Sequence, residues 1–298
     1  MTVGIWETPV GDQLFHGDNL AVLRLLPSES VTLAYMDPPF FTNRVHEMTD
    51  GRVAFDDRWP DQAAYLAMLA PRFVAMRNLL APHGSLVVHV DSRTSHYVKV
   101  MLDEIFGLEA FASEIIWRYR RWPSKTPNFQ RVHDVLLRYV KDPKVEPRWN
   151  QLYEPLAAST VKSWGTKKQK AEMMEDGKLK KRLKSTSTEA ETDGVPMGDV
   201  WDIGILAPSG KERVGYPTQK PEALLERLVG ALSDAGELIL DPCAGSGTTL
   251  AVAAKMGRRF IGIDSSPVAV ETMRVRLAPM VPREWREAWD VCCMEVGQ

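Results

Sequence analysis

Short apolar runs alternate with helix-like patterns over most of the chain. Five runs have the length and composition of buried strands, at residues 14–18, 31–37, 85–91, 237–241 and 259–264. Helices are expected in six stretches, at residues 19–26, 61–80, 96–106, 221–235, 248–256 and 267–277. Two further strands are expected at residues 114–120 and 134–140. This alternation predicts an α/β fold with a mostly parallel, doubly wound sheet that helices cover on both faces.

Two segments interrupt this alternation. Residues 41–59 have no clear period and many polar positions, so we expect a long loop there. From about residue 141 to 216 the apolar periodicity is poor, and a Lys-rich run is followed by Ser185-Thr186-Ser187-Thr188. The second segment indicates a region inserted into the α/β fold.

Composition places the chain among ordinary globular proteins. A length of 298 residues with 44% hydrophobic residues allows a sizeable core, as one large domain with an insertion or as two domains. No apolar stretch approaches the ~20 residues needed to cross a bilayer, and residues 1–10 do not resemble a signal peptide. The three cysteines, two of them adjacent at 292 and 293, form no disulfide framework. We therefore expect a cytoplasmic protein, and no set of metal ligands stands out.

The charge is unevenly distributed, which changes the meaning of the formal net charge of −2. Between Lys162 and Lys184, nine Lys and Arg residues face only three acidic ones. A second basic cluster, from Arg118 to Arg131, is interleaved with the aromatic residues Trp117, Tyr119, Trp122 and Phe129. Such clusters suit phosphate contacts and base stacking. A solvated helix face would explain the Lys-rich run equally well.

Two predicted strands end in an aspartate that a turn follows. The first is Asp37-Pro38-Pro39-Phe40, and the second, roughly 200 residues later, is Asp241-Pro242-Cys243-Ala244-Gly245-Ser246-Gly247-Thr248-Thr249. Ligands of open α/β sheets bind beyond the carboxyl ends of the strands, and glycines let the backbone approach them closely. Asp264 ends the next strand about twenty residues on, where nucleotide-binding folds hold ribose hydroxyls. This spacing alone fits NAD and S-adenosylmethionine equally, and also a plain glycine turn.

Together these motifs resemble the beta-class DNA amino-methyltransferases, which transfer a methyl group from S-adenosylmethionine to an exocyclic amine of a DNA base. In this permuted class the Asp-Pro-Pro-aromatic motif precedes the cofactor loop, as it does here. The resemblance covers residues 15 to about 120 and about 200 to 277. It implies a Rossmann-like methyltransferase fold with a catalytic half at residues 1–120, a target-recognition region at 121–199 and a cofactor-binding half at 200–298.

The resemblance also implies a set of cofactor-binding residues. In the stretch Tyr216 to Pro221, the family would hold the methionine end of the cofactor, with Lys220 opposite its carboxylate. Asp18 would lie near the adenine ring and Asp264 at the ribose. The full expected set is Asp18, Thr218, Gln219, Lys220, Asp241, Cys243, Ala244, Gly245, Ser246, Gly247, Thr248 and Asp264.

The expected catalytic residues are Asp37, Pro38, Pro39 and Phe40. The amine of a base is a poor nucleophile because its lone pair is delocalised into the ring. The Asp37 carboxylate and the Pro38 carbonyl could accept its two protons and localise that pair, while Phe40 stacks on the base. A base in a duplex must be flipped out to reach such a site. For an isolated Asp-Pro, a turn-capping role would be the simpler interpretation.

Cys243 follows a proline, as the nucleophile of cytosine-C5 methyltransferases does. Amine methylation needs no covalent adduct with the base, and no C5-type sequence surrounds this position. We therefore expect Cys243 to be a small packed residue and exclude it as a nucleophile.

The expected partner is double-stranded DNA. The residues expected to contact it are Arg120, Arg121, Lys125, Arg131, Lys167 and Lys168. Asp37 at the start of the motif favours adenine N6 as the methylated atom, with cytosine N4 as the closest alternative. A protein or RNA methyltransferase and a catalytically silent DNA-binding protein are more distant alternatives. The resemblance leaves room for a cognate restriction endonuclease and for a homodimer.

Overall fold

The computed structural model describes residues 12–123, 125, 127–174, 182–207 and 209–282, with the backbone alone given for 171–174 and 182–187. The chain divides into two compact units. The first unit comprises residues Met1–Asn150 and Asp199–Gln298, and the second comprises Gln151–Gly198.

Within the described residues, the first unit is built on an eight-stranded sheet of order β1-β14-β13-β2-β5-β7-β6-β12. In that order the strands are β1 (Gln13–His16), β14 (Arg259–Asp264), β13 (Leu238–Asp241), β2 (Val31–Met36), β5 (Leu80–Val90), β7 (His133–Val140), β6 (Phe111–Arg118) and β12 (Val200–Asp202). Every residue of the central strands β2 and β13 is buried. Their continuous apolar runs are typical of strands that are covered on both faces.

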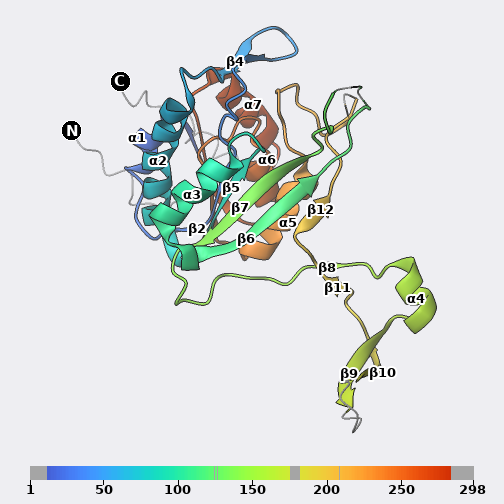
Figure 1. The fold of residues 1–298 in the computed structure, drawn as a ribbon. Coiled ribbons are helices and arrows are strands. Elements are labelled where there is room, and N and C mark those ends of the chain that lie inside the picture. The colour runs from blue at the N-terminus through green and yellow to red at the C-terminus, as the bar shows by residue number, and fades with distance from the viewer. Residues whose placement is uncertain (1–11, 124, 126, 175–181, 208, 283–298) are drawn as a thin grey trace. The chain divides into compact units, whose positions relative to one another are not determined.

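Two groups of helices cover the sheet, one on each face (Figure 1). One group consists of α1 (Asn19–Leu23), α2 (Gln62–Leu79) and α3 (Ser95–Phe106), followed by the short 3-10 helix η1 (Leu108–Ala110). The other consists of α5 (Glu222–Leu232), α6 (Thr248–Lys255) and α7 (Pro267–Leu277). Asp61 and Ser266 cap α2 and α7 through side-chain oxygens, which satisfies backbone N–H groups that have no partner within the helix. The predicted α/β fold with its mostly parallel sheet is therefore confirmed.

Strand direction decides where functional side chains can meet. β1, β14, β13, β2 and β5 are parallel to their neighbours in this order, whereas β7 is antiparallel to both β5 and β6. β6 therefore runs in the direction of β5, and β12 is parallel to β6. As a result, these strands all direct their carboxyl ends to one edge of the sheet, while β7 begins there.

The prediction of a long loop at residues 41–59 is wrong, because part of this segment forms a β-hairpin. Strand β3 (Val45–Glu47) pairs antiparallel with β4 (Val53–Asp56). The turn between them is closed by the N–H of Met48, which donates to the carbonyl of Arg52 at 2.8 Å, and Gly51 adopts the positive φ of 85° that the turn requires. Both strands are too short for the alternation of apolar and polar residues to be visible, so the sequence did not indicate them.

The second unit contains helix α4 (Ala158–Trp164) and two pairs of antiparallel strands. Strand β9 (Lys167–Met174) pairs with β10 (Arg182–Glu191), and β8 (Tyr153–Glu154) pairs with β11 (Val195–Pro196). No residue of α4 is buried. This second unit, Gln151–Gly198, is shorter than the target-recognition region expected at residues 121–199. Residues 133–140 instead form a buried strand of the main sheet, because their apolar side chains are packed in its core.

Candidate active site

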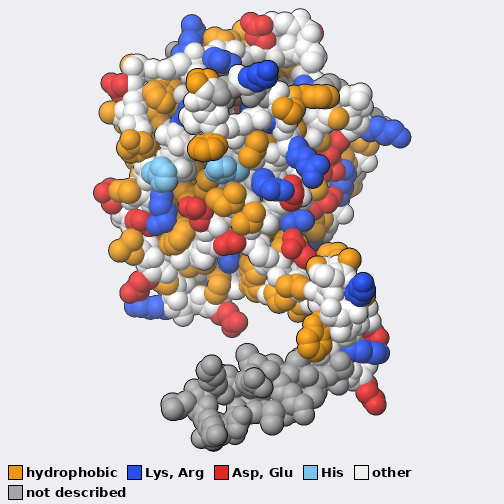
Figure 2. All heavy atoms as spheres, turned by 45° about the vertical axis from the view of Figure 1, so that its right-hand side comes forward, with side chains coloured by type: hydrophobic (Ala, Val, Ile, Leu, Met, Phe, Trp, Pro, Cys, Tyr) orange, Lys and Arg blue, Asp and Glu red, His pale blue; other side chains and the backbone are white. Residues whose placement is uncertain are grey.

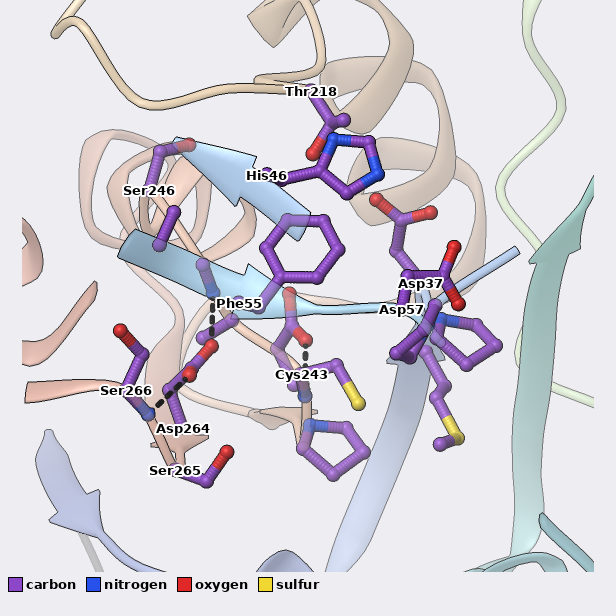
Figure 3. Close-up of a pocket in the computed structure, with 18 of the residues that line it drawn as sticks. Asp37, His46, Phe55, Asp57, Thr218, Cys243, Ser246, Asp264, Ser265 and Ser266 are labelled. Carbon is purple, nitrogen blue, oxygen red and sulfur yellow. Dashed lines mark hydrogen bonds between the residues drawn. The ribbon is translucent and has the colours of Figure 1, made fainter. Parts of the chain in front are cut away.

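A cavity of about 560 Å³ lies at the carboxyl edge of the main sheet (Figure 3). Its walls come from the ends of β1, β2, β13 and β14, from the segment before α5, and from the β3–β4 hairpin. Strand β13 pairs directly with β2, so Asp241 and Asp37 end neighbouring strands although they lie far apart in the sequence. This is the edge and the size at which α/β folds bind small molecules.

Most of the expected site residues line this one cavity. Those that do are Asp18, Asp37, Pro38, Pro39, Phe40, Thr218, Gln219, Lys220, Asp241, Cys243, Ala244, Gly245, Ser246, Thr248 and Asp264. Gly247 lies behind the cavity wall, where it begins α6 with a positive φ of 72°. A Cβ atom there would come within 2.9 Å of the Met273 side chain. Gly247 therefore shapes the turn, and the residues on either side of it line the cavity.

Asp264 is held in place by backbone groups of two turns. Its carboxylate accepts the N–H of Gly245 at 2.8 Å and the N–H of Ser266 at 2.8 Å (Figure 3). Burial outweighs these hydrogen bonds and raises the pKa of Asp264 above its usual range. Each carboxylate oxygen has a further lone pair, so a bound molecule with hydroxyl groups finds acceptors here.

Asp241, which is buried, and Cys243, which is partly buried, form the floor of the glycine turn. Asp241 is only 2% exposed, and burial raises its pKa to about 7 although it accepts the N–H of Cys243 at 3.1 Å. Burial likewise raises the pKa of the Cys243 thiol well above its usual range. A thiol that stays protonated is a poor nucleophile, which is consistent with the sequence-based exclusion of Cys243.

The ammonium group of Lys220 forms an ion pair with the carboxylate of Asp37. Lys220 is 9% exposed, and its Nζ lies 4.9 Å from the centroid of the Phe40 ring. The pair occupies Oδ2 of Asp37, whereas Oδ1 is buried without a hydrogen-bond partner among the described residues. The sequence suggested a cofactor contact for Lys220 but gave no sign of this pairing.

The neighbours of Lys220 hold their own loop in place. The Gln219 side chain donates to the carbonyl of Glu212 at 2.8 Å and accepts the N–H of Val214 at 2.9 Å. Thr218 is exposed and has a positive φ of 58°. Of the three expected contacts to the methionine end, Lys220 is therefore the one with a charged group directed into the site.

Asp18 caps α1 and forms an ion pair with a largely buried arginine. Its Oδ1 accepts the N–H of Leu20 at 2.8 Å, and its Oδ2 lies 2.6 Å from the guanidinium of Arg72. Asn19 donates to the carbonyl of Pro242 at 2.8 Å and so ties this turn to the glycine turn. The sequence placed Asp18 at the site but missed Asn19 and Arg72, which support it from the start of α1 and from α2.

The hairpin adds cavity residues that no sequence signal indicated. His46 of β3 stacks on Phe55 of β4, with ring centroids 4.5 Å apart and planes 13° from parallel. Figure 3 shows the Phe55 ring in the space between Asp37 and Asp264. Asp57 is fully buried and accepts the N–H groups of Phe41 and Thr42, which fixes the base of the hairpin. The segment expected to be irregular thus forms one wall of the site.

The residues expected to bind DNA lie outside the cavity. Arg120, Arg121 and Lys125 are exposed in the loop between β6 and β7, residues 119–132, together with Trp122 at 93% and Phe129 at 98% exposure. Arg131 of the same loop pairs with Asp91, which directly follows β5. This places the 119–132 loop at the carboxyl edge, beside the cavity. In Figure 2, Lys and Arg side chains lie among hydrophobic ones over the upper part of this unit.

Lys167 and Lys168 belong to the second unit. They form ion pairs there with Glu191 and Asp193, respectively. Exposed pairs of this kind exchange partners at little cost, so both lysines can still meet phosphate groups.

The cavity residues fit S-adenosylmethionine, the cofactor that the sequence resemblance implies. Asp264 offers acceptors for ribose hydroxyls at one wall, and Lys220 offers a cation for a carboxylate near Asp37. Gly245 has a positive φ of 50°, which glycine adopts without strain, and a Cβ atom there would come within 3.2 Å of the Tyr216 ring. When bound, the cofactor would supply an electrophilic methyl group.

The chain is similar in sequence to known DNA methyltransferases. The sequence profile of the DNA methylase family, which covers N6 and N4 methylases, matches residues 31–274. The Type II methyltransferase M.EcaI of Enterobacter cloacae is 29% identical, over 89% of this chain and 69% of its own length. The DNA adenine methyltransferase YhdJ of Escherichia coli K12 is also 29% identical, over 89% of this chain and 83% of its own.

Solved structures share the fold. The PvuII DNA methyltransferase, described as cytosine-N4-specific, superimposes with a TM-score of 0.60 at 18% identity and covers 95% of this chain and 92% of its own. The protein TTHA0409 of Thermus thermophilus, in complex with S-adenosyl-L-methionine, gives a TM-score of 0.57 at 23% identity over 91% of this chain and 95% of its own.

The family profile extends from β2, which leads to Asp37, to α7, and so includes most of the candidate site. None of the helices in the described part of the chain is long and apolar enough to span a membrane. The chain therefore belongs to the N6/N4 DNA methylase family, and it is a DNA amino-methyltransferase that uses S-adenosylmethionine.

Proposed function

We propose that this chain methylates the N6 atom of adenine at a specific sequence of double-stranded DNA. The observation that carries the proposal is the state of Asp37 at the end of β2. One of its oxygens is held by Lys220, and the other is a buried acceptor without a partner among the described residues. Asp37 lines the adjoining cavity, so its carboxylate can accept an N–H of an amine that binds there.

Pro38 supplies the second acceptor in this proposal. The Tyr65 hydroxyl donates to the Pro39 carbonyl at 2.8 Å, so that carbonyl is already engaged and the second proline is fixed. We assign the remaining N–H of the amine to the Pro38 carbonyl. Two acceptors of fixed position draw the amine nitrogen toward tetrahedral geometry, which exposes its lone pair to the methyl group.

Phe40 and the hairpin pair of His46 and Phe55 provide flat surfaces for the flipped base. Phe40 lies against the Lys220 ammonium group, and both hairpin rings line the cavity. Aromatic faces bind any base by stacking, so these rings support binding of a base but do not select adenine.

Two facts support adenine over cytosine. The motif begins with Asp, which in the resembling class is associated with adenine, and the relative YhdJ is described as a DNA adenine methyltransferase. One fact favours the second candidate, cytosine N4: the PvuII enzyme, described as cytosine-N4-specific, has the same fold. Both substrates present an exocyclic amine of the same geometry.

The test is to incubate purified protein with S-adenosylmethionine and unmethylated duplex DNA, digest the product to nucleosides, and quantify them by mass spectrometry. We expect N6-methyldeoxyadenosine alone. N4-methyldeoxycytidine in its place would overturn the adenine assignment. The absence of any methylated base, with folded protein that binds both reactants, would contradict the proposed function. Modification-sensitive sequencing of the same DNA reports the recognition sequence.

We also propose that the modified sequence is one that a restriction endonuclease cuts. The support is the relative M.EcaI, which is described as a Type II methyltransferase. DNA modified by this chain should then resist a nuclease of that recognition sequence. If nucleases specific for the sequenced motif cut modified and unmodified DNA equally, this role is excluded.

A further inference from the structure

A line of buried polar side chains leads from Asp37 across the sheet. It passes from Asp37 to His89 of β5, then to Asp134 of β7 and to Tyr119, which follows β6. His89 is fully buried, and Tyr119 and Asp134 are 2% and 8% exposed. The members come from adjacent strands of the sheet, so their order in space follows the strand order β2-β5-β7-β6.

Only one contact along this line is a hydrogen bond, and the two contacts of His89 are longer than hydrogen bonds. Nδ1 of His89 lies 3.9 Å from Oδ1 of Asp37, and its Nε2 lies 3.5 Å from Oδ2 of Asp134. The Tyr119 hydroxyl donates to Oδ1 of Asp134 at 3.0 Å. Oδ1 of Asp37 and Nε2 of His89 are both buried without a hydrogen-bond partner among the described residues. An unpartnered carboxylate oxygen next to an imidazole that has an unpartnered nitrogen of its own needs an explanation, because each such atom costs desolvation energy.

One arrangement of protons fits the contacts of His89 with Tyr35 and Asp134 and leaves Oδ1 of Asp37 free to accept a proton. The Tyr35 hydroxyl lies 2.8 Å from Nδ1 of His89, and burial raises the pKa of Tyr35 well above its usual range, so the hydroxyl keeps its proton. It can then donate to Nδ1, which places the ring proton on Nε2, facing Asp134. Burial raises the pKa of Asp134, but His89 and other partners outweigh it and leave the pKa lowered. A carboxylate therefore faces the Nε2 proton.

The reaction of this family creates a need for such a line. When the amine nitrogen forms its bond to the methyl group, the carbon–sulfur bond breaks and its electron pair stays on sulfur. The nitrogen then carries a positive charge until one N–H proton leaves. A neutral methylated base is formed only when that proton has been accepted elsewhere.

We propose that this proton leaves through Asp37, His89 and Asp134. Asp37 takes it on Oδ1, Nδ1 of His89 receives it, and Nε2 releases its own proton to Asp134, whose side chain is 12% exposed to solvent. As the proton arrives, the Tyr35 hydroxyl rotates so that it no longer donates to Nδ1. An imidazole can accept a proton on one nitrogen and release another from the opposite one, and it does so close to neutral pH. The proposal rests on the proposed function only in requiring an exocyclic amine, of adenine or of cytosine.

The charges around His89 favour this direction of transfer. Among the residues that the structure describes, the charged and titratable groups that face it are Asp37 and Tyr35 from β2 and its end, and Asp134 from β7. Lys220 acts from the segment before α5 by its pairing with Asp37. Its ammonium group disfavours a proton that stays on Asp37, since a neutral carboxyl group would lose the ion pair. The remaining ring contacts of His89 are Phe40 and Trp117, which exclude water from the line.

The central test compares His89→Gln with His83→Gln in single-turnover methylation between pH 6 and 9. His83 lies on the same strand at the opposite edge of the sheet and pairs with Glu237, which makes it a matched control. We expect His89→Gln to slow methyl transfer by about 10²-fold at pH 7. The deficit should shrink as pH rises, because hydroxide can then take the proton. Affinities for S-adenosylmethionine and for DNA, measured without turnover, should change less than threefold.

Asp134→Asn should show a smaller loss with the same dependence on pH. A rate within threefold of wild type in His89→Gln would overturn the proposal. A loss of the same factor at every pH would also overturn it, because it would indicate that His89 only orients Asp37. If His89→Gln does not fold, His89→Ala with imidazole in the buffer replaces it, and imidazole should restore a pH-dependent part of the rate.

A measurement on the free enzyme needs neither reactant. With ¹⁵N-labelled histidine, NMR should show His89 protonated on Nε2 and not on Nδ1, and the opposite tautomer would overturn the proposed line. A wild-type protein that methylates cytosine would refute the adenine assignment while leaving the proton route testable in the same variants. The two failures are therefore distinguishable.

Discussion

The ammonium group of Lys220 and the carboxylate of Asp37 meet although 183 residues separate them in the chain. Both side chains are largely buried, with 10% and 18% of their surface exposed. A buried pair of this kind gains little net stability, but removing one partner leaves the other charge uncompensated. At the scale of single residues, this pair links the group that we propose to hold the cofactor carboxylate to the group that we propose to contact the base.

Asp37→Asn tests that link. The change keeps the shape of the side chain and removes its charge, so we expect methyl transfer to fall by about 10² to 10³-fold. Affinity for S-adenosylmethionine, measured by calorimetry, should be retained or increase, because Lys220 no longer has a carboxylate of its own chain. Full turnover of the variant would remove Asp37 from the mechanism. Weaker cofactor binding would show that Lys220 does not serve the cofactor carboxylate.

The raised pKa of Asp241 predicts that the stability of the folded protein depends on pH. Its pKa in the folded protein is about 7, above the ordinary value of 3.8, because the side chain is buried. Between these values the folded protein binds more protons than the unfolded one, so its stability falls as pH rises from about 4 to 7. The contribution is on the order of a few kcal/mol.

Asp241→Asn should flatten this decline, with a thermal unfolding midpoint above that of wild type at pH 8 and similar to it at pH 4. Asp50→Asn is a suitable control, because Asp50 is exposed and the N–H of Arg52 lowers its pKa. An unchanged slope in the Asp241 variant would mean that the buried carboxyl group is not the source.

At the scale of elements, the loop at 119–132 has the features of a surface that binds DNA. It connects β6 to the antiparallel β7, so it lies at the carboxyl edge where the cavity opens. Arg120, Arg121 and Lys125 are exposed there, and Trp122 and Phe129 present almost their whole side chains to solvent. Large exposed aromatic side chains between basic ones are typical of surfaces that contact nucleic acids.

Replacing Arg121 and Lys125 by Gln should weaken DNA binding without changing the fold. Each lost phosphate contact should reduce the slope of log affinity against log salt concentration by about one. Arg24→Gln is the matched control, since Arg24 is exposed at the end of α1, away from the carboxyl edge. Fluorescence anisotropy with a labelled duplex measures the DNA affinity of wild type, of the Arg121 and Lys125 variant and of the Arg24→Gln control. Equal slopes would exclude the loop from DNA binding.

At the scale of the whole molecule, the net charge of −2 does not describe how the protein meets a polyanion. Basic residues gather in the 119–132 loop of one unit, and in the sequence they outnumber acidic residues nine to three between Lys162 and Lys184 of the other. Local charge at the surface of contact decides the attraction, because salt screens charges more than about 10 Å apart.

DNA binding by the intact chain should therefore weaken steeply with salt. If the six basic residues named from the sequence each neutralise a phosphate, the slope of log affinity against log salt should be roughly −5. Binding measured from about 50 to 200 mM salt tests this. An affinity that does not change with salt would contradict the assignment of both basic clusters.

The order of strands and helices, and the acidic residues at the strand ends, could be predicted from the sequence. Strand β14 and helix α7 agree with their predicted ranges at both ends. The glycine turn after Asp241 and the proline turn after Asp37 were equally clear. These features are local, because they depend on the spacing of apolar residues and on which backbone conformations glycine and proline permit.

Only the tertiary structure decided which side chains meet. The pairing of Lys220 with Asp37, the place of His89 between two carboxylates, and the hairpin wall with His46 and Phe55 had no counterpart in the sequence patterns. His89 stands as a single polar residue in the apolar run 86–90, which was a signal, but nothing in the run shows what it faces. The physical reason is that such contacts depend on strand order and on packing between segments far apart in the chain, whereas a sequence pattern reports only on neighbours.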